Sequence, residues 1–464
     1  MRRGLGPLLG LLLAGAAAAQ PPVAPTTYER AIAAGYKALT MCGAIFNAGR
    51  TQPQIEALEL TGIYPEYDAI VPTLTAEVHA PGADTAGAGE VSVAFDPGLA
   101  PRVARWHVND GCTILPIGDP GNEDPGTGRR AGGGTPPVAG SMDGQAWPIG
   151  DRNATAPPPP ALAAPVARAF DGRSYGAGRT TGVVIVRNGR IVGEHYADGF
   201  DMHISQRTWS VAKSISGTLI GIAVRQRLLA TSAPAAIPEW TDSRASIRLD
   251  DLLRMASGLH SATAGNRTDA LYFGGTIVTQ EAGYWPLEAR PGTRFRYANN
   301  DILFAIRALR AAIGDDARYH AFPRAELFAP LGMTRTVAET DAGGNFILSS
   351  QVWSTARDLA RLGLLWINDG VWQGRRILPE EWMRYMTTPS GPQPATGPGY
   401  GATMWLFGPA QGLPEGSYAA QGNRGQYVMV VPSRNLVVVR RGEDGGAMRF
   451  DIARFTADVM EALR

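Results

Sequence analysis

The pattern of apolar and polar residues predicts strands at both ends of the larger part of the chain and helices between them. The apolar runs 181–186 and 191–196 flank Asn188-Gly189, which is typical of the two-residue turn of a β-hairpin. A second hairpin is predicted over residues 427–440, around the turn Pro432-Ser433-Arg434-Asn435. Helical periodicity marks the segments 247–255, 302–312, 356–366 and 449–464. We therefore expect an α+β fold, with an antiparallel sheet built from both ends of this region and a helical insertion between them.

The beginning of the chain has a separate pattern. Residues 28–46 have the periodicity of a helix, and the alternating segments 73–78 and 91–95 indicate strands. These elements predict a small N-terminal domain over residues 20–115. The larger domain would then cover residues 166–464.

Glycine and proline are concentrated between these two domains. Residues 116–165 include Gly132-Gly133-Gly134 and Pro157-Pro158-Pro159-Pro160. Runs of this kind are typical of a linker or of a long surface loop. We therefore expect no regular core in this stretch.

Residues 1–19 have the pattern of a secretory signal peptide. Met1-Arg2-Arg3 precedes the apolar run Leu5–Leu13, and Ala17 and Ala19 fit the small-residue rule for cleavage. We therefore expect a periplasmic or secreted protein. The apolar run is too short to cross a bilayer, and no other stretch is long enough, so no membrane span is predicted.

Export would place the two cysteines, Cys42 and Cys112, in an oxidising compartment. A single disulfide between them is the prediction.

Two cysteines are too few for a Cys-only zinc site, and no H-E-x-x-H, Walker or G-x-G-x-x-G motif is present. We therefore expect neither a metal nor an organic cofactor.

Charge excludes another class of partner. The chain has 464 residues, 43 Lys+Arg and 42 Asp+Glu, and its net charge of +1 offers no general attraction for nucleic acid. Only Lys37 and Lys213 are lysines, and the other basic residues are arginines. Because arginine does not release its proton in proteins and a desolvated lysine can, the two lysines are informative positions.

One of them follows a serine at a spacing that suits nucleophilic catalysis. Ser210 and Lys213 are three positions apart, at the start of an apolar stretch, 215–224, that indicates a buried helix. Residues three apart lie on one face of a helix. A serine hydroxyl is a weak nucleophile and needs a neighbour to take its proton, which a desolvated lysine can do.

Further polar residues could complete this site. Tyr297-x-Asn299 could bring a phenol and an amide to the pair, and a tyrosinate stabilised by the lysine cation could act as base and then protonate the leaving group. Asn299 could hold the lysine or a substrate carbonyl. Alternatively, His260 or His203 could complete a Ser–His–acid triad.

These motifs resemble those of the class C β-lactamase-related serine hydrolases. The resemblance rests on Ser210-x-x-Lys213, Tyr297-x-Asn299, Met255-Ala256-Ser257-Gly258-Leu259 and Leu331-Gly332-Met333. Trp209-Ser210-Val211-Ala212-Lys213-Ser214 and Gly422-Asn423-Arg424-Gly425-Gln426 make the chain more similar to the branch of 6-aminohexanoate-dimer hydrolases and esterases. The resemblance covers about residues 166–464. It implies a β-lactamase/transpeptidase-like fold, in which a helical domain packs on an α/β sandwich, and a covalent acyl-enzyme.

The resemblance also implies roles for individual residues. Ser210 would be the nucleophile, and the backbone N–H groups of Ser210 and Asn423 would form the oxyanion hole. The β-lactamases have Lys-Thr-Gly where this chain has Ala420-Gln421-Gly422, which argues against β-lactamase activity. Arg424 could instead supply a cation for a substrate carboxylate, and Tyr272 could contact a substrate amine. Gly422 would lie on the substrate-binding strand.

The sequence thus predicts an exported serine hydrolase that cleaves a small amide or ester, as a 6-aminohexanoate-oligomer amidase or a carboxylesterase does. The alternative is a penicillin-recognising or D-amino-acid peptidase-like cell-wall protein, or a binding module without turnover. A small molecule is the expected partner, and a homodimer stays open. The N-terminal domain is a candidate cover for one side of the cleft.

Overall fold

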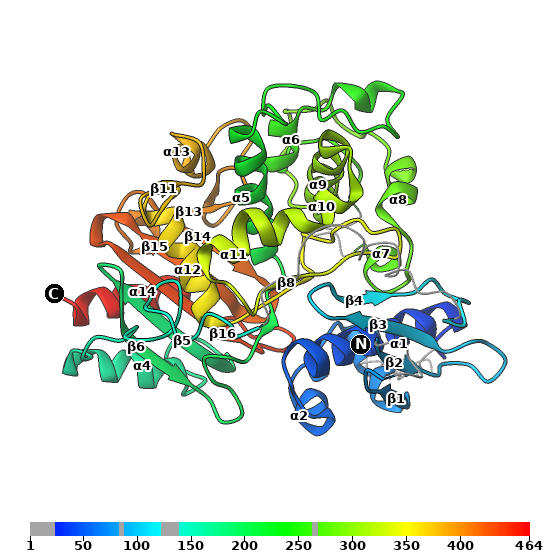
Figure 1. Ribbon diagram of the computed structural model, residues 1–464, viewed down its shortest axis with the longest axis horizontal. Coiled ribbons are helices and arrows are strands. Elements are labelled where there is room, and N and C mark those ends of the chain that lie inside the picture. The colour runs from blue at the N-terminus through cyan, green and yellow to red at the C-terminus, as the bar shows by residue number, and fades with distance from the viewer. Residues whose placement is uncertain (1–23, 83–87, 122–138, 262–267) are drawn as a thin grey trace, which may run out of the picture.

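The computed structural model describes residues 24–82, 88–121, 139–261 and 268–464 (Figure 1). The predicted signal peptide, residues 1–19, lies outside the described residues, as does the glycine run at 132–134. Among the described helices, none is both long and apolar enough to cross a membrane.

A seven-stranded antiparallel sheet forms the centre of the larger domain, in the order β12-β13-β14-β15-β16-β5-β6. Both predicted hairpins are confirmed within it. They are β5 (Thr180–Arg187) with β6 (Arg190–Tyr196), and β15 (Gln426–Val431) with β16 (Leu436–Gly442). The remaining strands are β12 (Gly399–Tyr400), β13 (Trp405–Phe407) and β14 (Ser417–Gly422).

The two hairpins lie side by side in the sheet. β16 pairs with β5, and Val437 lies opposite Val186. The first hairpin closes through Asn188 and Gly189, whose φ angles of 50° and 77° suit the primed turns that match strand twist. The sheet is therefore built from both ends of the domain, as the hydrophobic pattern predicts.

Helices cover both faces of this sheet. α12 (Ala356–Ile367) contacts β5, β15 and β16 on one face. α14 (Ile452–Ala462) and α4 (Ala163–Ala169) pack together on the other face. Successive residues of β5 therefore enter two different cores, with Val184 in the first and Ile185 in the second. Burial on both faces explains why β5 is a continuous apolar run.

A mostly helical part lies between the two hairpins, at the top of Figure 1. Its main helices are α5 (Val211–Arg225), α6 (Leu249–Leu253) and α9 (Asn299–Ile313), and α9 contacts the other two. The shorter elements are α7 (Asp269–Tyr272), α8 (Val278–Tyr284), α10 (Asp316–Pro323), α11 (Ala329–Leu331), α13 (Trp382–Thr387), β7 (Gln206–Arg207), β8 (Val337–Ala338), β9 (Val352–Ser354), β10 (Val371–Trp372) and β11 (Arg375–Arg376).

Residues 24–82 and 88–121, together called here the N-terminal region, form a helix packed on a small sheet. α1 (Thr27–Cys42) contacts β2, β3 and β4, and the antiparallel order is β1-β2-β3-β4. The strands are β1 (Ala76–His79), β2 (Gly89–Val93), β3 (Arg102–His107) and β4 (Gly111–Ile114), and two short helices are α2 (Gln52–Ala57) and α3 (Pro65–Asp68). A disulfide joins Cys42 to Cys112, as predicted.

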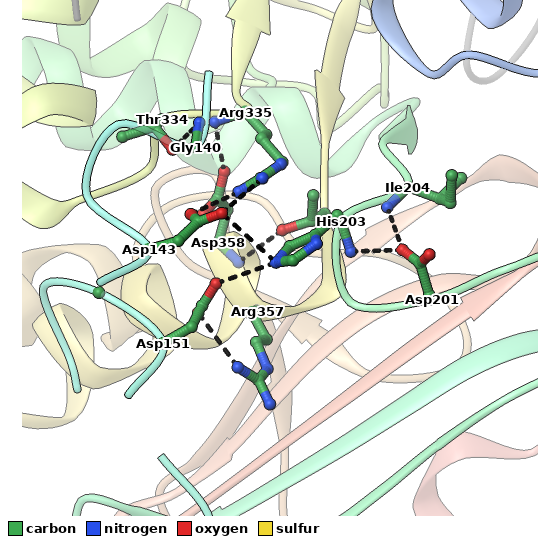
Figure 2. A network of polar contacts seen from close by, with 12 residues as sticks. Gly140, Asp143, Asp151, Asp201, His203, Ile204, Thr334, Arg335, Arg357 and Asp358 are labelled. Atoms are coloured by element: carbon green, nitrogen blue, oxygen red, sulfur yellow. Dashed lines mark hydrogen bonds and ion pairs between the residues drawn. The ribbon is translucent and has the colours of Figure 1, made fainter. Parts of the chain in front are cut away.

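The described part of the expected linker is a loop fixed to the larger domain. Arg361 of α12 donates hydrogen bonds to the carbonyl oxygens of Pro148 and Gly150, at 2.7 and 2.8 Å. Arg335 pairs with Asp143 through two contacts of 2.7 Å (Figure 2). Of the two interpretations of the Gly/Pro-rich stretch, the surface loop therefore fits residues 139–159, and the helical turn Pro160–Leu162 and α4 begin before the expected boundary at residue 166.

Candidate active site

The N-terminus of α5 brings the predicted nucleophile and its neighbour together. Ser210 is the residue that precedes α5, and Lys213 lies in the first turn of this buried helix. The Nζ of Lys213 donates to the Oγ of Ser210 at 3.0 Å. Trp209, just before Ser210, has a φ of 50°, a conformation uncommon for a bulky residue. Such backbone strain is typical of functional sites.

Lys213 is held by groups from two other segments. Its Nζ also donates to the Oδ1 of Asn299, at 2.5 Å, and to the carbonyl oxygen of Ser349, at 2.9 Å. Only 1% of Lys213 is exposed. Desolvation lowers its pKa from 10.5 to about 7, and the charge of Asp301 opposes this shift. Lys213 can therefore be neutral near neutral pH, as a proton acceptor must be.

Tyr297 lies above this lysine with its phenol directed to the nucleophile. Its ring centroid is 5.0 Å from the Nζ of Lys213, and the ring packs against Trp405 at 5.3 Å. Burial raises the pKa of Tyr297, and a hydrogen bond with Ser210 offsets part of this effect. The phenol therefore stays protonated at neutral pH. Burial disfavours the charged form of both side chains, which favours Lys213 over a tyrosinate as the base, and the role of the tyrosinate stays a prediction.

A cleft of about 470 Å³ opens above Ser210. The predicted residues that line it are Ser210, Tyr272, Tyr297, Asn299, Gly422, Asn423 and Arg424. Lys213 is buried beside them through its contact with Ser210. The fold thus gathers in one place residues from α5, α7, α9 and the end of β14.

Gly422 allows the last part of β14 to approach the nucleophile closely. A Cβ at this position would lie 2.3 Å from the carbonyl oxygen of Thr208 and 3.1 Å from the backbone N of Ser210. No side chain fits there, because backbone atoms cannot move aside. The glycine therefore brings Asn423 next to the backbone of Ser210, which suits the predicted oxyanion hole.

Arg424 does not have the predicted role of a cation for substrate. Its side chain lines the cleft but is only 5% exposed, and its Nε donates to Glu443 at 2.6 Å. A terminal nitrogen donates to the carbonyl oxygen of Leu58 at 2.7 Å. The guanidinium charge is thus compensated within the protein. Its partners, Glu443 and Leu58, are distant in the sequence, so the residues near Arg424 do not indicate this pairing.

Tyr272 is buried in the wall of the cleft, and its hydroxyl contacts the Oγ of Ser349. Burial raises its pKa to about 12. Because the carbonyl oxygen of Ser349 also accepts from Lys213, Tyr272 lies one residue away from the catalytic pair. Its contact with a substrate amine stays a prediction.

Several residues of the site are missed by the sequence analysis. Ser349, Trp405 and Tyr64 carry no recognisable motif, and each comes from a segment far from Ser210 in the sequence. Asp301 is the exception, since it follows Asn299 by two positions. Its buried carboxylate accepts from the Oγ of Ser257 at 2.8 Å, and burial raises its pKa to about 7.

The alternative catalytic histidines lie elsewhere. His260 contacts Glu288 at 2.5 Å, and His203 contacts Asp151 at 3.3 Å (Figure 2). Neither histidine lines the cleft that contains Ser210. Within the described residues, the structure therefore gives no support to a Ser210–His–acid triad.

His203 also belongs to the cluster that Figure 2 shows. Asp143, Asp151 and His203 offer ligand atoms within 4.8 Å of one another. However, Arg335 pairs with Asp143 at 2.7 Å, and Arg361 pairs with Asp151 at 2.9 Å. These guanidinium groups compensate the carboxylates, so we assign the cluster to holding the surface loop.

Comparisons with known proteins agree with this fold. The chain is 26% identical over 296 residues to the 6-aminohexanoate-dimer hydrolase of Paenarthrobacter ureafaciens, covering 56% of this chain and 72% of that protein. A Bacillus anthracis protein named as a presumed 6-aminohexanoate-dimer hydrolase superposes with a TM-score of 0.55 and 20% identity, over 71% of this chain and 87% of its own.

EstCE1, described as a hydrolase with promiscuous acyltransferase activity, superposes with a TM-score of 0.51 and 16% identity, over 65% of this chain and 98% of its own. Both solved structures share the large antiparallel sheet with flanking helices at the level of the fold. The sequence profile of the Beta-lactamase family matches residues 166–452, which is more than half of the chain. The protein is therefore a member of the beta-lactamase family of serine hydrolases.

Proposed function

We propose that the protein cleaves a small amide or ester through an acyl-enzyme on Ser210. The observation that carries this proposal is the 3.0 Å contact between Ser210 Oγ and Lys213 Nζ, with the lysine buried and its pKa lowered to about 7. A neutral amine at hydrogen-bonding distance from a serine hydroxyl can take its proton and so activates the serine as a nucleophile.

Acylation begins when neutral Lys213 accepts the proton of Ser210. The Oγ then attacks the substrate carbonyl carbon, and the oxyanion receives hydrogen bonds from the backbone N–H groups of Ser210 and Asn423. Each such donor typically lowers the barrier by about 3 kcal/mol. Tyr297 donates its phenol proton to the departing amine or alkoxide and recovers a proton from the lysine ammonium.

Deacylation repeats these steps with water as the nucleophile. Neutral Lys213 takes a proton from the water, which attacks the ester carbonyl of the acyl-enzyme. The tetrahedral intermediate then releases Ser210, whose oxygen regains its proton. Water access to the acyl group thus decides between turnover and stable acylation.

Two relatives favour the same class of substrate. One is by its name a hydrolase of the 6-aminohexanoate dimer, and EstCE1 is described as a hydrolase with promiscuous acyltransferase activity. In this chain the cleft is lined by aromatic rings, among them Trp209, Tyr297 and Trp405, which suit the apolar parts of a small substrate. We place the activity outside the cytoplasm, on the basis of the signal peptide pattern and the disulfide.

The test is the intact mass after incubation with a fluorophosphonate probe. We expect one adduct on the wild type and none on Ser210→Ala or Lys213→Arg. Turnover of p-nitrophenyl acetate then separates a hydrolase, with sustained release, from a binding module, with one stoichiometric burst. The absence of an adduct on the wild type would refute the proposal.

A further inference from the structure

The N-terminal region supplies one wall of the cleft that contains Ser210. Tyr64, which directly precedes α3, lines this cleft together with Trp209 and Ser210. The rings of Tyr64 and Trp209 meet edge to face, with centroids 6.4 Å apart. Tyr64 therefore touches the residue adjacent to the nucleophile, although it lies in the N-terminal region, and both rings belong to the same hydrophobic cluster.

The segment that carries Tyr64 is fastened to the turn beside Asn423. Arg424 donates to the carbonyl oxygens of Leu58 and Thr61, at 2.7 and 3.2 Å. The carbonyl oxygen of Gly62 accepts from the backbone N–H of Gly446 at 2.7 Å. The position of Tyr64 is thus fixed to the backbone that would form the oxyanion hole.

The same region also holds α7, which ends at Tyr272, another residue that lines the cleft. Tyr67 contacts Asp269 through its hydroxyl, and the ring of Tyr36 packs against Phe273 with centroids 4.8 Å apart. Arg102 donates to the carbonyl oxygen of Phe273 at 2.9 Å. Because Phe273 follows Tyr272, the N-terminal region supports Tyr272 as well as Tyr64 in the lining of the cleft.

The aromatic residues of the cleft fall into two groups, and this division separates the two halves of a substrate. Tyr297 packs with Tyr400 and Trp405, whereas Tyr64 packs with Trp209 and with Tyr36 of the N-terminal region. A leaving group must face Tyr297 to receive its proton. The acyl group, bonded to Ser210, then points to the other aromatic group.

We propose that Tyr64 is a specificity-determining residue that limits the width of the acyl group. This inference rests on the proposed function, because it uses the acyl-enzyme on Ser210. The ring of Tyr64 admits a slender acyl chain beside Trp209 and excludes a broad one. The N-terminal region is accordingly part of the active site.

The experiment compares kcat/KM for p-nitrophenyl acetate and p-nitrophenyl benzoate, which differ only in the acyl group. In Tyr64→Ala we expect the benzoate-to-acetate ratio to rise on the order of tenfold over the wild type, and in Tyr64→Trp to fall. The matched control is Tyr28→Ala, in the same region, where the ring is 57% exposed and lines a different cavity. Its ratio should equal that of the wild type.

Unchanged ratios in both Tyr64 variants, with an active wild type, would overturn the inference. If Tyr64→Ala does not fold, Tyr64→Leu and Tyr64→Trp carry the comparison, since both keep apolar bulk against Trp209. A wild type with neither turnover nor a fluorophosphonate adduct would instead refute the acyl-enzyme, and the assignment of Tyr64 with it. The two failures are therefore distinguishable.

Discussion

Replacing Lys213 with arginine would exchange a titratable amine for a permanent cation at the same place. Burial lowers the pKa of Lys213 from 10.5 to about 7. At pH 7.5, a pKa of about 7 leaves roughly three-quarters of the lysine neutral, whereas a pKa of 10.5 would leave about 0.1%. Burial thus increases the neutral form by nearly a thousandfold, which corresponds to about 4 kcal/mol.

The wild type should therefore show a kcat/KM that rises with pH and levels off above a midpoint near 7. kcat/KM reports the titration of the free enzyme, in which Lys213 is the proton acceptor. Lys213→Arg should lose this rise and fall about 10²- to 10⁴-fold in kcat/KM, the usual contribution of a general base. The rate is best followed with p-nitrophenyl acetate at the isosbestic wavelength of the nitrophenol.

A second readout is the stability of the fold. Because the lysine pKa is lower in the folded chain, the unfolded chain binds more protons between about pH 7 and 10.5, and stability rises with pH over this window. Below pH 7 this group lowers the free energy of unfolding by roughly 4–5 kcal/mol. Lys213→Met should remove that pH dependence in urea unfolding.

Two results would refute this reasoning. One is a Lys213→Arg variant that keeps the wild-type rate and the wild-type pH profile. The other is a wild type whose kcat/KM does not change between about pH 5.5 and 8.5. This range is centred on the lowered pKa of Lys213, about 7, so the titration of the lysine must fall within it. Circular dichroism and thermal melting of each variant serve as the folding control.

Three further outcomes are expected. Gly422→Ala should lower kcat/KM on the order of a hundredfold, because the added Cβ would displace an oxyanion donor. The control is Gly283→Ala, where a Cβ meets nothing within 4 Å and kcat/KM should not change. Equal activities of the two variants would contradict the close approach of Gly422 to the backbone of Ser210. Arg424→Gln should lower the free energy of unfolding by about 3–5 kcal/mol by leaving a buried carboxylate unpaired. The control Arg384→Gln, in an ion pair with the arginine 76% exposed, should change it by less than about 0.5 kcal/mol, and similar losses in urea unfolding would contradict the assignment. Replacing both cysteines of the Cys42–Cys112 bridge, 70 residues apart, should cost about 4 kcal/mol in the same assay, and no loss would show that the bridge does not constrain the unfolded chain.

Local patterns predicted the parts of the fold that local physics determines. Asn188-Gly189 has the positive φ angles that its hairpin requires, and the apolar run after Ser210 is a buried helix. The spacing of Ser210 and Lys213 places them on one side of that helix, so their contact follows from sequence alone.

Other parts depend on which distant segments meet. The carbonyl groups that hold Arg424 come from residues 58–62, and nothing near Arg424 in the sequence announces them. Tyr64 enters the cleft for the same reason. Which of Lys213 and Tyr297 is the base depends on how deeply each is buried, which the sequence does not give. Desolvation lowers the pKa of Lys213 and raises the pKa of Tyr297.

The pairing of β5 with β16 has a consequence for how the chain acquires its structure. The strand that opens the larger domain has its partner near the opposite terminus, with Val186 beside Val437. Contacts between residues far apart in the sequence, such as these, slow folding, because a long loop must close before they form. During synthesis, β5 emerges with only β6 available as a neighbour, and the sheet beneath α5 cannot close until β16 arrives. Nascent chains should therefore need protection from aggregation until late, and C-terminal truncation should abolish the whole domain rather than trim it.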